Sequence, residues 1–331
     1  MINSSFAVPV YHSIDEIPAG FGPTVAAIGN FDGVHAGHRR ILGAAVDESR
    51  RLRQTNPQTC AIAITFDPHP EQFLRPSEAP LLITPLHERL RLLATTGIDA
   101  ILVLPFNAAL ASLPAGVFVE QVLVRRLALR SLHEGANFHF GHGAEAGVAE
   151  LIAFGKDFGF ELTVHSSVHI HARPEVGRTG LEVSSSAIRE CVAEGRLTWA
   201  RWMLGRPFTL HSSTARGRGV GTRLLVPTVN LAEYSGLLPA FGVYATCLAI
   251  AGRRFQAVTN VGNRPTFGGA GFSIESHLLD FEPIDLDEET PVALEFHLPL
   301  RAEQEWSSPE SLKAQIFKDI AHAQRYFRRA Q

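Results

Sequence analysis

The chain has few cysteines for its 331 residues. The three, Cys60, Cys191 and Cys247, are odd in number, far apart in the sequence and without a CxxC spacing. They therefore predict neither a disulfide framework nor a zinc site, and they favour a reducing, cytoplasmic setting.

An excess of one charge and long apolar runs are also lacking. Lys and Arg number 30 against 33 Asp and Glu, a net charge of −3 without any block of like charge, so we expect no nucleic-acid partner. No apolar run approaches the roughly 18–20 residues that span a bilayer. Residues 1–20 lack the charged start and apolar core of a secretory signal. We therefore expect no membrane association and small molecules as partners, and the sequence leaves open whether the chain forms a homo-oligomer.

Strand-like and helix-like patterns alternate in the first half of the chain. Apolar strand patterns lie at 24–28, 59–66, 100–105 and 160–165, and helical patterns lie between them at 37–51, 86–95 and 115–126. This alternation predicts βαβ units around a parallel, Rossmann-like sheet, in which ligands bind at the carboxyl ends of the strands.

The pattern changes after about residue 190. From about 205 to 300, short strand patterns are separated by Gly- and Pro-bearing turns, which predicts a small antiparallel β-barrel. One amphipathic helix follows, with Ser308 as its N-cap and Pro309 in its first turn. We therefore predict an α/β domain at 1–195 and a barrel domain with a C-terminal helix at 205–331.

The strongest local signal is IGNFDGVHAGH at 28–38, where a strand is expected to end and a helix to begin. Gly29 and Gly33 let the backbone turn tightly and approach a ligand. His35 and His38 are three residues apart at the helix start, so both rings can face one side. Helix N–H groups there favour phosphate, and paired imidazoles can stabilise charge that develops during group transfer. The alternative interpretation is two polar histidines on a surface turn.

This segment resembles the signature of the HxGH nucleotidylyltransferases and, more narrowly, of the bifunctional riboflavin kinase/FMN adenylyltransferase family. Further segments resemble that family in the same order along nearly the whole chain: TFDPHP at 65–70, GANFHFG at 135–141, SSSAIR at 184–189, LGRP at 204–207, PTVN at 227–230, GVY at 242–244, NVGNRPT at 260–266 and ESHLLDF at 275–281. The resemblance implies an N-terminal nucleotidylyltransferase domain followed by a barrel of the riboflavin kinase type.

The resemblance also implies an enzyme of FAD synthesis with two reactions. The C-terminal module phosphorylates riboflavin with ATP to give FMN, and the N-terminal module transfers AMP from ATP to FMN, giving FAD and pyrophosphate. Mg²⁺ is the implied cofactor. Three alternatives stay open: an adenylyltransferase with a degenerate kinase domain, a nucleotidylyltransferase acting on a flavin analogue, and a non-catalytic flavin or nucleotide sensor.

The resemblance assigns roles to individual residues. The expected catalytic residues are His35, His38, Arg189 and Glu275, with Glu275 as the base that takes the proton of the ribityl 5′-hydroxyl. The expected nucleotide-binding residues are Gly29, Asn30, Phe31, Asp32, Ser184, Ser185, Gly217, Gly221, Thr228 and Asn230, of which Thr228 also binds Mg²⁺. The expected flavin-binding residues are Asp67, Asn137, Phe138, Phe140 and Arg301.

Three of these assignments have plain structural alternatives. Serines at a helix start most often act as an N-cap, a role compatible with phosphate binding. Phe138 and Phe140, two phenylalanines at alternate positions, are more often part of a core. Glu275 could be an exposed residue on an alternating strand.

The chain also departs from the family pattern. The kinase phosphate loop GxxxGRxxGFPTAN becomes GRGVGTRLLVPTVN at 217–230, with Thr222 in place of the arginine and Leu225 in place of a glycine. Leucine at a point where the backbone approaches phosphate can block that approach, which is the basis of the degenerate-kinase alternative. His165, His169 and His171 lie close in sequence, but no Cys, Asp or Glu completes a typical ligand set, so we expect no metal site there.

Overall fold

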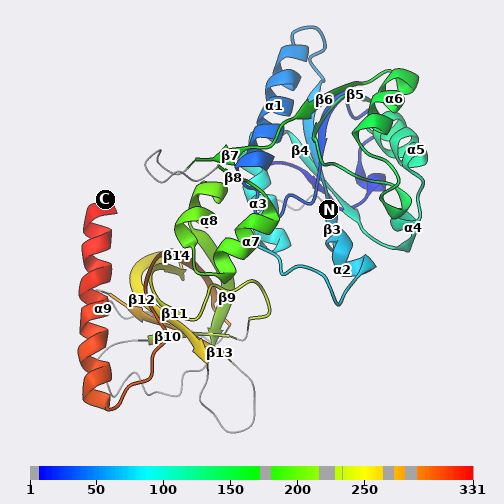
Figure 1. The fold of residues 1–331 in the computed structure, drawn as a ribbon. Coiled ribbons are helices and arrows are strands. Elements are labelled where there is room, and N and C mark those ends of the chain that lie inside the picture. Colours follow the sequence, from blue (N-terminus) through cyan, green and yellow to red (C-terminus); the bar gives the residue numbers. More distant parts are fainter. Residues whose placement is uncertain are drawn as a thin grey trace. The chain divides into compact units, whose positions relative to one another are not determined.

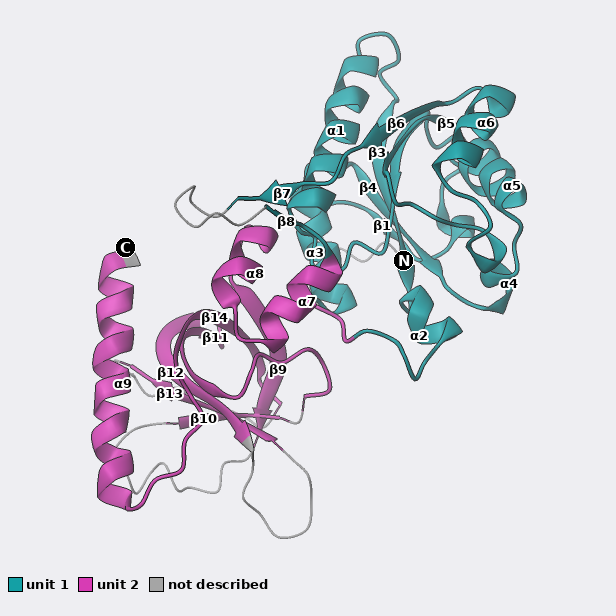
Figure 2. Ribbon diagram, in the orientation of Figure 1, with its two compact units in different colours: residues 1–80, 84–184 teal, residues 81–83, 185–331 magenta. Residues whose placement is uncertain are grey.

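The structure is a computed structural model that describes residues 7–171, 180–215, 228–232, 234–263, 272–279 and 289–330. It divides into two compact units (Figure 2). Unit 1 comprises Met1–Pro80 and Thr84–Ser184, and unit 2 comprises Leu81–Ile83 and Ser185–Gln331. The predicted domain limits at 195 and 205, which divide the two activities, stay a prediction. No helix among the described residues is long and apolar enough to cross a membrane.

Unit 1 contains a six-stranded parallel sheet with the strand order β1-β4-β3-β2-β5-β6 (Figure 1). Because β2 lies between β3 and β5, the chain order reverses there, and a crevice is expected outside the carboxyl ends of β2 and β5. The strands are β1 Val10–Tyr11, β2 Thr24–Ile28, β3 Cys60–Asp67, β4 Ala100–Pro105, β5 Leu129–Gly135 and β6 Glu161–His165.

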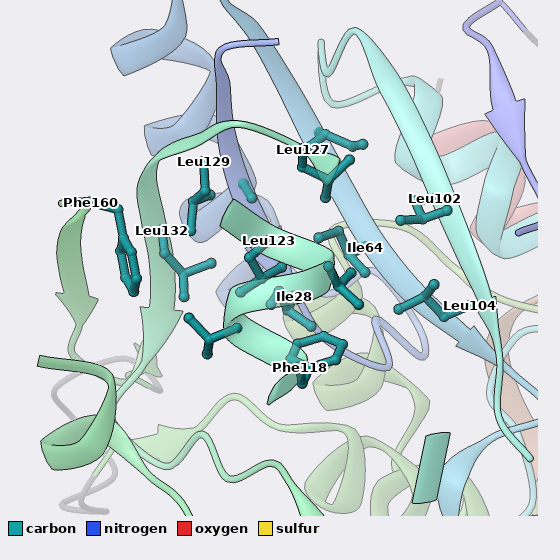
Figure 3. Packing of buried hydrophobic residues seen from close by; sticks show 14 of the residues in the cluster. Ile28, Ile64, Leu102, Leu104, Phe118, Leu123, Leu127, Leu129, Leu132 and Phe160 are labelled. Carbon is teal, nitrogen blue, oxygen red and sulfur yellow. The ribbon is translucent and has the colours of Figure 1, made fainter. Parts of the chain in front are cut away.

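Helices cover both faces of this sheet. One buried cluster, with Leu42 of α1 and Leu93 of α3, lies against Ala27 and Ala63 on one face. The other cluster packs Phe118, Leu123 and Leu151 against the opposite face, as Figure 3 shows for the first two. The helices are α1 Ala36–Leu52, α2 Pro70–Leu74, α3 Leu86–Ala94, α4 Ala108–Ala111, α5 Ala115–Phe118, the π-helical η2 Val119–Arg126 and α6 Val148–Phe158; the short 3-10 turns η1 Ile14–Glu16 and η3 His142–Ala144 and the strand pair β7 His169–Ile170 and β8 Leu181–Glu182 complete the unit.

Unit 2 is a closed antiparallel barrel with the order β10-β13-β12-β11-β14-β9, preceded by two helices and followed by one. Ala323 and Phe327 of the last helix pack against Val243, Ala245 and Val258 on the outside of the barrel. The elements are α7 Ser185–Ala193, α8 Leu197–Leu204, β9 Phe208–Ala215, β10 Thr228–Leu231, β11 Gly242–Ile250, β12 Arg253–Asn263, β13 Phe272–Leu278, β14 Pro291–Ala302 and α9 Pro309–Ala330. The predicted order of a parallel sheet, a barrel and a final helix is confirmed.

A chain of hydroxyl groups crosses the interior of the barrel. Since Ala245 and Val258 face α9, the next residues, Thr246 and Thr259, point inward. Thr246 Oγ1 lies 2.7 Å from Thr259 Oγ1, which lies 2.8 Å from Ser276 Oγ. All three residues are fully buried, so neutral hydroxyls satisfy one another across β11, β12 and β13.

Candidate active sites

The Gly29–His38 loop leaves β2 at the point where the strand order reverses. The Gly29 N–H donates to the Ile64 carbonyl at 3.0 Å, which continues the pairing with β3 for one residue beyond β2. Phe31 and Val34 then adopt positive φ angles of 48° and 39°, a conformation that is uncommon for residues other than glycine. Both side chains are buried, so packing holds this turn in a fixed shape.

His35 and His38 stand at the start of α1 with their rings stacked. The centroids are 3.6 Å apart at an interplanar angle of 18°. His35 is the N-cap, and its Nδ1 accepts the His38 N–H at 3.3 Å. A Cβ on Gly37 would lie 3.1 Å from Cε1 of the His35 ring, so glycine between the histidines leaves room for the stack. The expected juxtaposition of the two rings is present.

His38 is held as a neutral imidazole. Burial lowers its pKa well below the ordinary value, and the neighbouring His35 and Arg89 lower the pKa further. Its Nδ1 is buried and has no hydrogen-bond partner in the described part of the chain. A neutral, buried imidazole at the positive end of a helix can donate a hydrogen bond from its one N–H group to a phosphate oxygen.

Asp32 ties the loop to Thr84 through hydrogen bonds. Its Oδ1 accepts hydrogen bonds from the Thr84 N–H at 3.0 Å and from Thr84 Oγ1 at 3.2 Å, and the same Oγ1 accepts the Gly33 N–H at 3.0 Å. Asp32 is 1% exposed. Its carboxylate therefore shapes the loop, while its expected contact with the nucleotide stays a prediction.

Sequence reasoning missed Arg89, which ties two strand ends together. Arg89 is 1% exposed, and it donates to the Asn30 carbonyl at 2.9 Å and to the Phe66 carbonyl at 2.8 Å. The available signal was its position on the apolar face of α3, three residues from Leu86 and four from Leu93. A buried guanidinium here places a positive charge beneath the expected phosphate site.

Glu134 is a second buried group that the motifs did not reveal. It is 2% exposed at the carboxyl end of β5, and its Oε1 accepts the Ile28 N–H at 2.8 Å. Burial raises the pKa of this carboxyl well above its ordinary value, although hydrogen bonds from the Ile28 and Gly135 backbones oppose the shift. The raised pKa favours the neutral acid, and the hydrogen bond from Ile28 fixes the backbone directly before Gly29.

The expected flavin-side residues lie near the same edge of the sheet. Asp67 ends β3 and is exposed, and Asn137 is exposed in the loop after β5. The rings of Phe138 and Phe140 stack with centroids 5.5 Å apart and pack against the buried cluster under α5 and η2. The two phenylalanines are thus partly core, and their expected contact with a flavin stays a prediction.

The Ser184–Arg189 segment falls on the division between the units. Ser184 ends unit 1, and α7 begins unit 2 at Ser185. Arg189 Nε donates to the Leu81 carbonyl at 2.8 Å. The expected roles of Ser184 and Ser185 in nucleotide binding and of Arg189 in catalysis stay predictions.

In the barrel, β10 and β13 bring the expected kinase residues together. Asn230 is directly opposite Glu275, and Glu275 is in turn opposite Asn260 of β12. Thr228, two residues before Asn230, shares its face of the strand. Glu275 is exposed, which agrees with the alternative that it is an ordinary exposed strand residue. Its function as a base therefore stays a prediction. Gly217, Gly221, Thr222 and Leu225 lie outside the described residues.

The oxygen donors of this pair of strands match a hard cation. A hydroxyl and an amide carbonyl, from Thr228 and Asn230, are ligands that Mg²⁺ accepts while it keeps several waters. Among the described residues, no group of three or more His, Cys, Asp or Glu could hold a metal ion. The donor set therefore fits Mg²⁺ bound partly through water and substrate.

Arg301 is engaged within unit 2. Its Nε donates to Asp319 Oδ2 at 2.9 Å, and its guanidinium lies 5.3 Å from the centre of the Trp306 ring. Asp319 is 5% exposed on α9, so this ion pair joins β14 to the last helix. The expected flavin contact of Arg301 stays a prediction.

The two units correspond to two families of flavin-processing domain. The family model for FAD synthetase matches residues 18–178, and the family model for riboflavin kinase matches residues 204–327. The chain is therefore a nucleotidylyltransferase domain joined to a flavokinase barrel.

Curated relatives share both domains in one chain. The bifunctional riboflavin kinase/FMN adenylyltransferase of Escherichia coli K12 is 33% identical over 304 residues, covering 92% of each chain. The Pseudomonas fluorescens protein of the same name is 35% identical over 300 residues, covering 90% of this chain and 91% of its own. The chain belongs to the bifunctional riboflavin kinase/FMN adenylyltransferase family, which confirms the expected family and enzyme class.

A solved structure shows the same fold. The crystal structure of a macrolide-efflux protein from Streptococcus pneumoniae has a TM-score of 0.81 and covers 95% of this chain and 98% of its own. At 24% sequence identity, this similarity bears on the fold alone.

Proposed function

We propose that this chain makes FAD from riboflavin in two ATP-dependent steps. Riboflavin is phosphorylated to FMN in unit 2, and FMN is adenylylated to FAD in unit 1 with release of pyrophosphate. The observation that carries the second step is the stacked pair of His35 and His38 at the start of α1, directly after the strand at which the sheet order reverses. Membership of the family supports both steps.

In adenylyl transfer, a phosphate oxygen of FMN attacks the α-phosphorus of ATP, and the bond to the β-phosphate breaks. Negative charge grows on the leaving pyrophosphate, where the N–H groups of the α1 N-terminus and the neutral imidazole of His38 can donate hydrogen bonds. Arg89 and Glu134 fix the backbone at Asn30 and Ile28, on either side of Gly29 where this loop begins. These groups are positioned before substrate binds, so little reorganisation is needed during the reaction.

In the kinase step, the ribityl 5′-hydroxyl attacks the γ-phosphorus of a second ATP, and ADP leaves. Glu275 is proposed as the general base, opposite Asn230 in the barrel. Thr228 and Asn230 would hold Mg²⁺, which neutralises charge on the phosphate oxygens when bound.

Product analysis with purified full-length protein, ATP and Mg²⁺ tests the proposal. Riboflavin alone should give FMN and then FAD, and FMN alone should give FAD and pyrophosphate in equal amounts. No FAD from FMN would refute the adenylyltransferase assignment. A flavin analogue that is turned over faster than FMN would instead favour the analogue-specific alternative.

The degenerate-kinase alternative rests on Thr222 and Leu225 in the phosphate loop. It predicts FAD from FMN but negligible FMN from riboflavin, together with a gain in the double variant Thr222→Arg, Leu225→Gly. A wild-type kinase turnover within the usual range of about 1–100 s⁻¹, unimproved by the double change, would exclude it.

We also propose a cytoplasmic setting with small-molecule substrates and no nucleic-acid partner, and assembly into a homo-oligomer stays open to measurement. The setting is supported by three free cysteines and by the near balance of charge.

A further inference from the structure

Two histidines and a glutamate form a hydrogen-bonded row on the α1 face of the sheet. Glu48 Oε2 of α1 lies 2.8 Å from Nε2 of His133 on β5, and His133 Nδ1 lies 3.1 Å from Nε2 of His165 on β6. The His133 side chain is 3% exposed and that of Glu48 is 14% exposed. The sequence grouped His165 with His169 and His171, but the fold pairs it with a residue 32 positions away.

With Glu48 ionised and both rings neutral, the row fixes which atom of each ring carries a proton. An ionised Glu48 can only accept, so His133 Nε2 donates to it. The Nδ1 of a neutral His133 then accepts, and its partner, His165 Nε2, must carry a proton. A neutral His165 is thereby left with a lone pair on Nδ1, for which the described residues provide no hydrogen-bond partner.

His165 lies where a nucleotide is expected to extend. It ends β6 and is partly exposed at the carboxyl edge of the sheet. β6 is two strands from β2, about 10 Å at ordinary strand spacing. A nucleotide whose phosphates lie at the start of α1 can therefore extend as far as His165. His133 is opposite Ala27 and shares its α1-facing side of the sheet, whereas Phe138 packs on the other face.

We propose that His165 is a further nucleotide-contacting residue for adenylyl transfer, whose Nδ1 accepts a hydrogen bond from ATP. The inference rests on the proposed function. Phosphate oxygens are themselves acceptors, so the matching group is a donor, either the amino group of the base or a ribose hydroxyl. Glu48 and His133 are positioning residues, because they set the tautomer of His165 without touching the substrate.

The surroundings of His165 favour its neutral form. Burial, the neighbouring His133 and Arg40 of α1 all lower the pKa of His165. On the far side, Arg51 Nη2 lies 3.6 Å from Glu48 Oε1. Protonation of His165 at lower pH turns Nδ1 into a donor, so the KM for ATP should rise as the pH falls through that pKa.

Kinetics with FMN as the acceptor substrate test the contact, because they read the adenylyl site alone. The change His165→Ala should raise the KM for ATP about five- to tenfold with little change in kcat, as expected for one neutral hydrogen bond. The matched control is His169→Ala, an exposed position on β7, which should leave both constants unchanged.

Three ATP analogues identify the donor: one without the amino group of the base, one without the 2′-hydroxyl and one without the 3′-hydroxyl. The analogue that lacks the donor to His165 should have a higher KM than ATP in the wild-type protein, by the same factor as His165→Ala raises the KM for ATP. With that analogue, His165→Ala should cause no further rise in KM. A KM penalty of His165→Ala that persists with all three analogues, or no penalty with ATP, would overturn the proposal.

The tautomer can be measured without turnover. In full-length protein with ¹⁵N-labelled histidine at neutral pH, His165 should show a protonated Nε2 and an unprotonated Nδ1, and ATP with Mg²⁺ should shift the Nδ1 resonance. The change Glu48→Leu should remove the tautomer preference. A protonated Nδ1 in the wild-type protein contradicts the inference, even if the protein makes FAD. If the protein makes no FAD, the shift on adding ATP still decides whether His165 contacts the nucleotide.

Discussion

The sheet edge of unit 1 and the barrel interior of unit 2 bury different kinds of polar group. Unit 1 buries ionisable side chains beneath the carboxyl edge of its sheet, among them Arg89, Glu134 and His133. The barrel interior of unit 2 instead contains the neutral hydroxyls of Thr246, Thr259 and Ser276. The difference teaches that the carboxyl edge of the sheet is held by buried ionisable groups, whereas the barrel interior is held by neutral hydroxyls and the buried carboxylate of Asp319 lies on α9.

The largest expected effect is the loss of riboflavin phosphorylation without any loss of adenylyl transfer. Glu275→Gln removes the proposed base of the kinase and should lower FMN formation from riboflavin by about 10²–10⁴-fold, while FAD formation from FMN stays unchanged. Rates of both reactions measured on the same preparation give the result. Equal loss of both activities would show that the two sites depend on each other.

His38→Ala is the matching change in unit 1. It removes a neutral hydrogen-bond donor at the start of α1 and should lower adenylyl transfer by about 10²–10³-fold, with the kinase step unaffected. The measurement is pyrophosphate release with FMN as substrate. Wild-type turnover in a folded variant would remove His38 from the mechanism.

A smaller effect is expected for Arg89→Met. The Phe66 carbonyl loses its donor, whereas the Asn30 carbonyl keeps the Thr65 hydroxyl at 3.2 Å. One unsatisfied carbonyl costs about 1–3 kcal/mol in the free energy of unfolding, which denaturant titration measures. Arg89→Lys should recover part of this loss, and an undiminished stability in Arg89→Met would show that the guanidinium does not hold the strand ends.

Glu134→Gln should change the pH dependence of stability. The pKa of Glu134 is raised in the folded protein, so its stabilising contribution is complete below the unfolded pKa and is lost as the pH rises toward the folded value. The slope for one proton is at most about 1.4 kcal/mol per pH unit. The variant keeps an acceptor for Ile28, and unfolding measured from pH 4 to pH 9 should lack that slope. Parallel curves for the two proteins would contradict a neutral Glu134.

The smallest effect belongs to the barrel. Thr259→Val removes the central hydroxyl of the chain of hydroxyl groups inside the barrel. The change should lower the free energy of unfolding by about 1 kcal/mol. Because no ionisable group is lost, the loss should be the same across that pH range. A loss that varies with pH would break the contrast between the units.

The sequence predicted the order of elements and the pairing of His35 with His38, because both follow from short-range periodicity. It did not reveal Arg89 or Glu134, whose partners are backbone groups that distant strands bring together. Nor did it reveal that the Asp32 carboxylate accepts hydrogen bonds from Thr84, 52 residues away. Contacts of this kind depend on strand order and register, which no local pattern encodes.

The course of the backbone between the units has a consequence for dissecting the chain. Leu81–Ile83 belongs to unit 2 although the residues on both sides belong to unit 1, and the Leu81 carbonyl accepts from Arg189. A single cut after Ser184 would therefore leave Leu81 on one fragment and Arg189 on the other. A cut after residue 195 would keep that bond but separate α7 from α8 and uncover the buried face of α7. The two units therefore cannot be separated by one cut in the sequence without a redesigned end, because a short segment of unit 2 lies within the sequence of unit 1.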